Sequence, residues 1–205
     1  MTKRHWFAFI LSFGSLLAFS EPDRGVWVID QLIGFRDDSM IYRQIVTDNE
    51  GSHYRSHIES YIVEKNMRTN EVLSIERVSY VEYRYDSLQR KTESIGRSED
   101  KLIDVVNKRP YLFYELDYAI PLGVPDDESR RISFKDDLVI VGNEKESREQ
   151  RYDVRKAIPK STIKEKAKSL LQVYEYRDCI VVLIDFGEPY GDANYYQKLI
   201  AIPRS

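Results

Sequence analysis

The feature that most constrains the fold is an alternation of apolar or aromatic runs with clusters of turn-forming residues. The runs are rich in Val, Ile and Tyr, which favour extended backbone. The clusters between them are rich in Asp, Asn, Gly and Ser, which tolerate the tight conformations of chain reversals. The predicted strands are residues 26–35, 40–47, 56–64, 71–76 and 78–85. This order of strands and short turns predicts an antiparallel meander.

The middle of the chain carries helix signals instead. Asp86 or Ser87 can cap a first helix that ends near Gly96, and Ser98 can cap a second helix that Pro110 ends. The second helix has an apolar stripe made of Leu102, Val105 and Val106. We therefore predict a helical pair over about residues 87–109.

The remainder, about residues 111–203, is predicted to be rich in β-structure. Residues 111–120 are predicted to be extended and residues 121–127 to form a loop, while the pattern of 163–170 is ambiguous and could form one or two helical turns. The predicted strands are residues 131–134, 138–141, 171–177, 179–184 and 195–202. The run at 179–184 is apolar throughout, which predicts a strand buried on both faces.

Residues 1–20 have the three-part pattern of a secretory signal peptide. A basic start at residues 3–5 precedes an apolar, uncharged run at 6–19, and Ala18 and Ser20 are small residues of the kind that signal peptidase recognises. The apolar run is short for a membrane span. We predict an exported protein, periplasmic or secreted, with no stable membrane span after signal removal. The alternative is a segment kept as an N-terminal anchor.

Charge and cysteine content exclude several function classes. The 205 residues carry a formal net charge of -3 at pH 7, which gives no electrostatic reason to bind nucleic acid. The one cysteine, Cys179, excludes a disulfide framework and the cysteine-rich zinc modules. Cys179 begins an apolar run, so we predict a buried, unreactive thiol; an exposed, reactive thiol is the alternative.

Two hairpin motifs are similar to those of β-propeller blades. Residues 34–42, G-F-R-D-D-S-x-x-Y, resemble the strand-turn-strand pattern G-F-S-x-D-G-x-Y of blade repeats. Residues 69–73, T-N-E-V-L, resemble the T-G-E-V-L hairpin that closes a blade, and D-x-x-G-S-x-Y-x-S-x-I at 48–58 lies between them. Together they resemble a family of predicted secreted bacterial proteins of unknown function. The resemblance covers residues 26–76 and implies no catalytic residues.

The resemblance also implies an order of parts, in which one blade-like segment precedes a helical pair and a β-rich C-terminal half. We predict an α+β fold, mostly antiparallel β, with a blade-like N-terminal meander, short central helices and a C-terminal β-hairpin. The single secreted domain, residues 21–205, would contain the meander at about 26–85, the helices at about 87–109 and the β-rich remainder.

A tyrosine stripe is the predicted partner-binding site. Tyr80, Tyr83 and Tyr85 lie close together on the strand predicted at 78–85. Tyrosine has an apolar body and a polar tip, and it is enriched at protein interfaces. The alternative is that these tyrosines cover the half-hydrated face of a sheet.

Two acidic turns are the predicted cation site. Asp37 and Asp38 lie in one turn, and Asp48 and Glu50 lie in the next. Calcium takes six to eight oxygen ligands and tolerates irregular loops, so the four residues could hold calcium if the turns met. The alternative is that the side chains build the turns through hydrogen bonds to the backbone.

These observations predict a secreted or periplasmic, non-catalytic domain that binds an unknown envelope or extracellular protein. The first alternative is a periplasmic small-ligand or calcium-binding protein. A hydrolase of envelope polymers is the second alternative, because paired carboxylates can cleave glycosides. The carboxylates considered for that reaction are Asp178, Asp185, Glu188 and Asp192.

Overall fold

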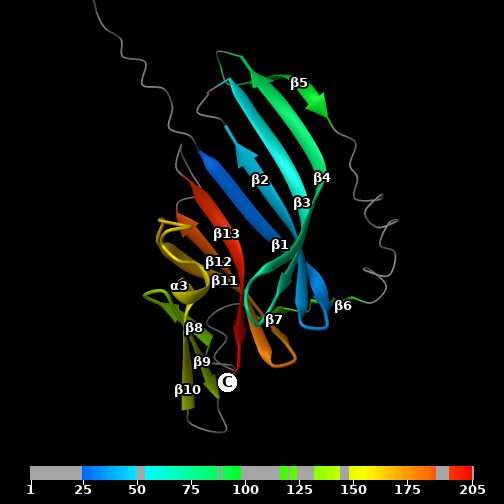
Figure 1. Ribbon diagram of the computed structural model, residues 1–205. Coiled ribbons are helices and arrows are strands. Elements are labelled where there is room, and N and C mark those ends of the chain that lie inside the picture. The colour runs from blue at the N-terminus through cyan, green and yellow to red at the C-terminus, as the bar shows by residue number, and fades with distance from the viewer. Residues whose placement is uncertain are drawn as a thin grey trace, which may run out of the picture.

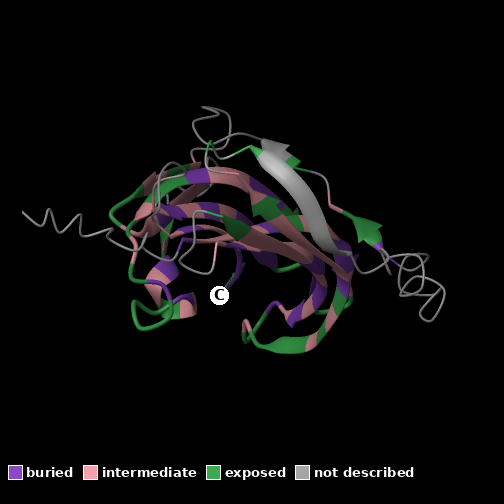
Figure 2. Ribbon diagram, turned by 90° about the horizontal axis from the view of Figure 1, so that it is seen from above, coloured by how far each residue is buried: buried purple, intermediate pink, exposed green. Residues whose placement is uncertain are grey.

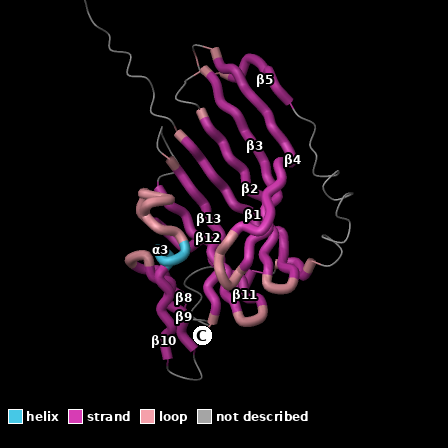
Figure 3. The backbone as a smooth tube through the Cα atoms, in the orientation of Figure 1, coloured by secondary structure: helices cyan, strands magenta, loops and turns pink. Residues whose placement is uncertain are grey.

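The computed structural model describes residues 25–49, 54–86, 88, 90–97, 116–119, 121–123, 132–143, 148–187 and 194–204. The predicted signal segment at residues 1–20 lies outside these ranges. Within them the chain is almost entirely β-strand, with one four-residue helix (Figure 3). No helix in the described ranges has the length and apolarity needed to cross a membrane.

Five strands follow one another in an antiparallel meander. They are β1 (Val26–Arg36), β2 (Ser39–Asp48), β3 (Arg55–Asn66), β4 (Val72–Tyr85) and β5 (Lys91–Arg97). The turns after β1 and β3 place Asp37 at φ 51° and Asn70 at φ 59°. Asp and Asn enter this left-handed region more readily than most residues. The strands predicted within residues 26–85 are confirmed, and the last two join into the single strand β4.

The C-terminal half continues the same sheet from the other edge of β1 (Figure 1). Its strands, in order away from β1, are β13 (Tyr195–Pro203), β12 (Cys179–Gly187), β11 (Ala167–Tyr176) and β7 (Pro121–Gly123). Strand β6 (Asp117–Tyr118) pairs with the end of β1. The pair β1–β13 is parallel, whereas the other described pairs are antiparallel, so the two halves of the chain share one mixed sheet of ten strands.

A small second sheet and the helix cover one face of this half. They are β8 (Ile132–Lys135), β9 (Leu138–Asn143), β10 (Arg148–Asp153) and α3 (Val154–Ala157). Val139 of β9 and Val154 of α3 pack against Ile180, Val182 and Ile200 in one core cluster. The opposite face of β12 enters a second cluster, so the prediction of a strand buried on both faces is confirmed.

The second cluster forms where β1 and β13 part. Their parallel pairing covers three residue pairs, from Trp27–Tyr195 to Ile29–Gln197, and then ends. By the alternation of side chains along a strand, Leu32 and Leu199 then belong to opposite faces of the sheet. Both nevertheless pack in this cluster, with Phe35 among others. The strand ends therefore diverge around a wedge of apolar side chains, in a sheet whose curved profile Figure 2 shows from above.

The predicted α+β class is wrong. The first predicted helix, which would end near Gly96, is replaced over Lys91–Arg97 by β5, which pairs with the end of β4. The second predicted helix, at about 98–109, lies outside the described residues. Pro121–Gly123, predicted as loop, forms β7, and the ambiguous segment 163–170 contains the start of β11 rather than a helix. The meander is also not a separate blade, because β1 pairs directly with β13.

Candidate functional site

A buried carboxylate lies where β1 and β13 part. Asp30 of β1 has a fully buried side chain, which forms an ion pair with Lys198 Nζ at 2.8 Å. It also accepts hydrogen bonds from Gln44 Nε2 at 2.9 Å and from the backbone N–H of Leu199 at 3.1 Å. The Leu199 N–H thus bonds to the Asp30 side chain instead of to the backbone of β1, whose pairing with β13 has ended at Gln197. Asp30 therefore stabilises the backbone of β13 beyond the last residue paired with β1.

A second lysine approaches the same place from β3. Lys65 is buried and donates from Nζ to the backbone carbonyl of Leu199 at 3.3 Å. Burial and, less strongly, the neighbouring charge of Lys198 lower the pKa of Lys65, whereas Asp30 opposes the shift; the resulting pKa is about 8. Burial and the charge of Asp30 both raise the pKa of Tyr42. Asp30, Lys65 and Tyr42 are thus buried polar side chains that lie beside the apolar wedge between β1 and β13.

Asn70 continues this lining along β13. Its side-chain amide donates to the carbonyl of Ala201 at 2.9 Å, and its side-chain oxygen accepts from the N–H of Ala201 at 3.1 Å. The Asn70 side chain thus makes the two hydrogen bonds that the backbone of a neighbouring strand would make to Ala201. Together, Asp30, Lys65 and Asn70 bond the backbone of Leu199 and Ala201, so the β3–β4 turn is fixed against β13.

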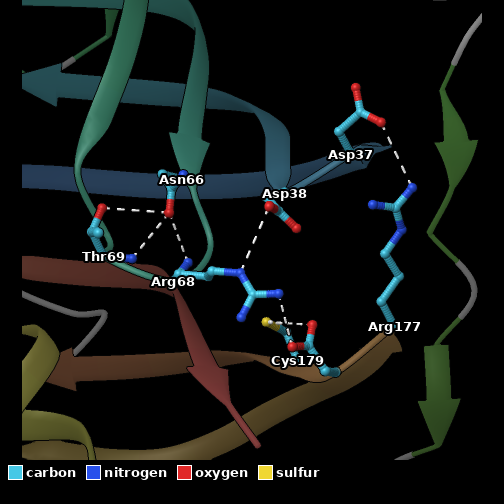
Figure 4. Close-up of polar contacts among 8 residues, drawn as sticks. Asp37, Asp38, Asn66, Arg68, Thr69, Arg177 and Cys179 are labelled. Atoms are coloured by element: carbon cyan, nitrogen blue, oxygen red, sulfur yellow. Dashed lines mark hydrogen bonds and ion pairs between the residues drawn. The ribbon is translucent and has the colours of Figure 1, made fainter.

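Three hairpin turns meet at one end of the sheet, as Figure 4 shows. Arg68, from the β3–β4 turn, forms ion pairs with Asp178 at 2.9 Å and Asp38 at 3.6 Å. Arg177, from the β11–β12 turn, lies 3.7 Å from Asp37. These pairs are largely exposed, and exposed pairs contribute little stability individually. We call this group the turn cluster; it ties turns from both halves of the chain together.

Cys179 lies beneath the turn cluster. Its side chain is buried, and its sulfur lies 3.9 Å from Asp178 Oδ1. Burial raises the pKa of the thiol, and the charge of Asp178 raises it further. A raised pKa keeps the thiol protonated near neutral pH, and the protonated form is the poorer nucleophile. The prediction that Cys179 is buried is confirmed.

The three predicted tyrosines do not share one face. Tyr80 stacks on His57 with ring centroids 5.9 Å apart, and it donates to Glu82 at 3.1 Å. Tyr83 and Tyr85 lie on the opposite face by strand alternation, and Tyr85 is bonded to Ser56 at 3.1 Å. Moreover, β5 pairs with this end of β4. The structure therefore separates Tyr80 from the other two.

The acidic turns are not brought together either. Asp37 and Asp38 precede β2, whereas Asp48 is its last residue, about 30 Å away along an extended strand. Asp48 is buried, and Glu50 lies outside the described residues. Among the described residues, no three His, Cys, Asp or Glu side chains form a group that could hold a metal ion.

The carboxylates considered for hydrolysis are likewise dispersed. Asp178 precedes β12 and Asp185 lies near its far end, while Glu188 and Asp192 fall outside the described residues. Asp185 accepts hydrogen bonds from the Ser169 backbone at 2.6 Å and from its hydroxyl at 2.7 Å. It therefore holds β11 against β12 at a place where their register shifts.

A pocket of about 380 Å³ opens beside the β3–β4 turn. Its walls come from residues 68–70 of that turn, from the end of β10 with α3, and from residues 200–203 of β13. Arg68, Arg151 and Lys156 give it three cationic side chains, against the single carboxylate of Asp153. No local sequence pattern indicates this pocket, because its walls come from three distant segments.

The outer edge of β4 carries exposed apolar side chains. Val72, Leu73 and Ile75 are 54%, 55% and 58% exposed. Strand β5 pairs only with residues 81–85, and no other described strand pairs with β4 on this side between Val72 and Tyr80. We call residues 72–77 with this unpaired side the open edge. The run V-L-S-I could have indicated it, because its apolar residues do not alternate as they do in a half-buried strand.

Comparison with known protein families, with curated proteins and with solved structures finds no match to this chain.

Proposed function

We propose that this chain is an exported, non-catalytic interaction domain that holds an extended, apolar segment of a partner protein along the open edge of β4. Export is inferred from the signal-peptide pattern at residues 1–20. The partner would accordingly be an envelope or extracellular protein.

The observation that carries this proposal is the combination of exposed apolar side chains with a strand edge. An edge strand presents backbone N–H and C=O groups that another extended chain can pair with. In strand addition, these backbone bonds supply affinity and the neighbouring side chains select the sequence. Val72 and Ile75 oppose Lys65 and Val63 of β3, so they share a face next to the apolar wedge. An added strand would extend that apolar surface.

On the face that carries Val72 and Ile75, the charges favour an uncharged occupant; Glu76 lies on the other face by the register with β3. Arg77 is paired with Glu59 at 3.0 Å, and its guanidinium lies 5.7 Å from the centre of the Tyr80 ring. The nearest cation is therefore already neutralised. Tyr80 shares the face of Ile75 by the register with β3, so Tyr80 remains a proposed contact for the partner. Tyr83 and Tyr85, on the other face, are not part of this surface.

Peptide selection tests the proposal. Random twelve-residue peptides displayed on phage are selected on the exported protein, and the enriched peptides are synthesised for binding and hydrogen-exchange measurements. We expect stretches of about six extended, apolar residues that slow exchange of amides within residues 72–77. Ile75→Lys should weaken binding at least ten-fold, because one buried apolar side chain contributes roughly 1.5–3 kcal/mol and 1.4 kcal/mol is about a factor of ten.

Leu88→Lys is the matched control. Leu88 is 69% exposed and lies beyond the end of β4, so this change also replaces an exposed apolar side chain with a cation. It should leave peptide affinity unchanged. The proposal is refuted if no peptide is enriched, if Ile75→Lys binds as tightly as the wild type, or if exchange within β4 does not change.

A second candidate function is the binding of a small ligand. The observation that favours it is the cationic pocket beside the β3–β4 turn. Calcium is not proposed as that ligand, because Asp37 and Asp38 lie at the opposite end of β2 from Asp48.

A further inference from the structure

We propose that the pocket beside the β3–β4 turn binds a small organic anion, with a carboxylate or phosphate group held by Arg151 and Lys156 and an apolar body lying against β13. This inference develops the second candidate function. It does not depend on strand addition at β4, and its test changes other residues, so the two proposals can fail separately.

The size and lining of the pocket suit a ligand that has an anionic group at one end and an apolar body at the other. A volume of about 380 Å³ falls within the range of roughly 300–1,000 Å³ that is typical of ligand sites. The half-buried Ala157 of α3 and Pro203 of β13 supply apolar surface, whereas Thr69 and Tyr152 supply hydroxyl groups. Ligand sites commonly combine an apolar lining with a few placed polar groups.

One wall of the pocket is fixed in advance. Asn70 is bonded through both ends of its side-chain amide to the backbone of Ala201. Asn66 Oδ1 accepts hydrogen bonds from the N–H groups of Arg68 at 2.8 Å and Thr69 at 3.0 Å. A wall held by such bonds need not be ordered when a ligand enters, which reduces the cost of binding.

The charges of the pocket favour an anion. The guanidinium of Arg68 is already paired with Asp178 and Asp38 in the turn cluster. The carboxylate of Asp153 accepts the N–H of Arg155 at 2.8 Å and caps α3. The two cations that remain are Arg151 and Lys156.

These two cations are weakly engaged by the protein itself. Among the described residues, Arg151 makes an ion pair only with Glu149, a long and exposed contact of 3.4 Å. Lys156 is exposed and has no ion pair within the part of the chain that the structure describes. Both can therefore turn toward an anionic group. Carboxylate and phosphate groups both have anionic oxygens that accept hydrogen bonds from Arg and Lys. A cationic ligand would be repelled by the same two side chains.

Calorimetry with four small probes tests the proposal on the exported protein. Benzoate and phenyl phosphate carry the expected anionic groups, whereas benzyl alcohol is neutral and benzylamine is cationic. We expect one or both anions to bind, more weakly as salt is added, and the other two probes not to bind. The stronger anion identifies the group that the site prefers.

Two variants locate the binding. Arg151→Gln combined with Lys156→Gln should weaken anion binding at least ten-fold, and Ala157→Phe should do the same by filling the apolar part without changing charge. Lys164→Gln combined with Lys166→Gln is the matched control, because it removes the same charge at exposed positions outside the pocket. Affinity should not change in this control.

Four results would overturn the proposal. They are no binding of either anion, equal binding of benzylamine, equal loss of affinity in the control, and unchanged affinity in the Ala157→Phe variant. The last result would mean that the anion binds to surface charge and not in the pocket.

Discussion

Replacing Lys65 with Met should change how the stability of the fold depends on pH. Lys65 is buried, and its pKa lies near 8 in the folded chain, against 10.5 in an unfolded one. Between these two values the unfolded chain binds the proton and the folded chain has released it. The free energy of unfolding therefore rises with pH across this window. The cost of burying the ammonium group is fully present only below about pH 8.

The size of the effect follows from the pKa difference. A shift of one pKa unit corresponds to about 1.4 kcal/mol, so burial of charged Lys65 costs about 3 kcal/mol at neutral pH. About 2 kcal/mol of that cost should be relieved between pH 7 and pH 9.5. Cys179, whose pKa is raised, acts in the opposite direction in this range, but it does so equally in the wild type and in the Lys65→Met variant.

Urea unfolding of both proteins at pH 7 and pH 9.5 measures this difference. We expect the wild type to gain about 2 kcal/mol relative to Lys65→Met, while the exposed control Lys164→Met follows the wild type. Parallel pH dependences of the wild type and Lys65→Met would refute the reasoning. If Lys65→Met does not fold, the reaction rate of the Lys65 amine with an acylating reagent gives its pKa directly. A value above 10 would likewise refute it.

Three further substitutions test the contacts that fix β13 and the last hairpin, each by denaturant unfolding. Asp30→Asn should cost about 3–5 kcal/mol, because it breaks an ion pair whose carboxylate is fully buried and leaves the half-buried Lys198 without its partner; a loss below 1 kcal/mol would contradict this. Asn70→Ala should cost about 1–3 kcal/mol, because the backbone groups of Ala201 lose both bonds; unchanged stability would exclude this contribution. Gly187→Ala should also destabilise, because φ is 85° and the added Cβ would collide with the Asn194 carbonyl oxygen; a more stable variant would contradict the backbone geometry.

The N-terminal strands were predictable because their signal is local. A hairpin joins segments that are neighbours in sequence, and the turn residues between β1 and β2 and between β3 and β4 are of the types that such turns need. The parallel pairing of β1 with β13 has no such local signal. It joins Val28 to Tyr196, which are far apart in the sequence, and only the packing of the whole chain selects it.

The helix predicted after Asp86 shows how a local signal can mislead. Asp86 Oδ1 does accept the N–H groups of Leu88 at 2.8 Å and Arg90 at 2.9 Å, much as a helix cap would. The same side-chain bonds also stabilise a chain reversal. Here the chain turns back as β5 and pairs with β4, so pairing across the hairpin decides the outcome over local helix preference.

The candidate site residues were the least predictable part, for a related reason. Tyr80, Tyr83 and Tyr85 are close in sequence, but the alternation of side chains along β4 places Tyr80 on the opposite face from the other two. The two acidic turns were adjacent in sequence, but successive turns of a meander lie at opposite ends of a strand. The pocket, by contrast, draws its walls from residues 68–70, 151–153, 156–157 and 200–203, which lie too far apart in the sequence for a local pattern to link them.

One residue did carry a long-range signal in the sequence. Asp30 is the only charged residue in the run from Val26 to Phe35, and an isolated carboxylate in such a run is rarely buried unless it is paired. In the structure it is paired, and it lies where β1 stops contacting β13. A charge within an apolar strand can thus mark the point where strand pairing ends and side chains complete the backbone hydrogen bonds. Beyond that point, Asp30, Lys65 and Asn70 bond the backbone of Leu199 and Ala201. These bonds hold the β3–β4 turn, and with it one wall of the pocket, against β13.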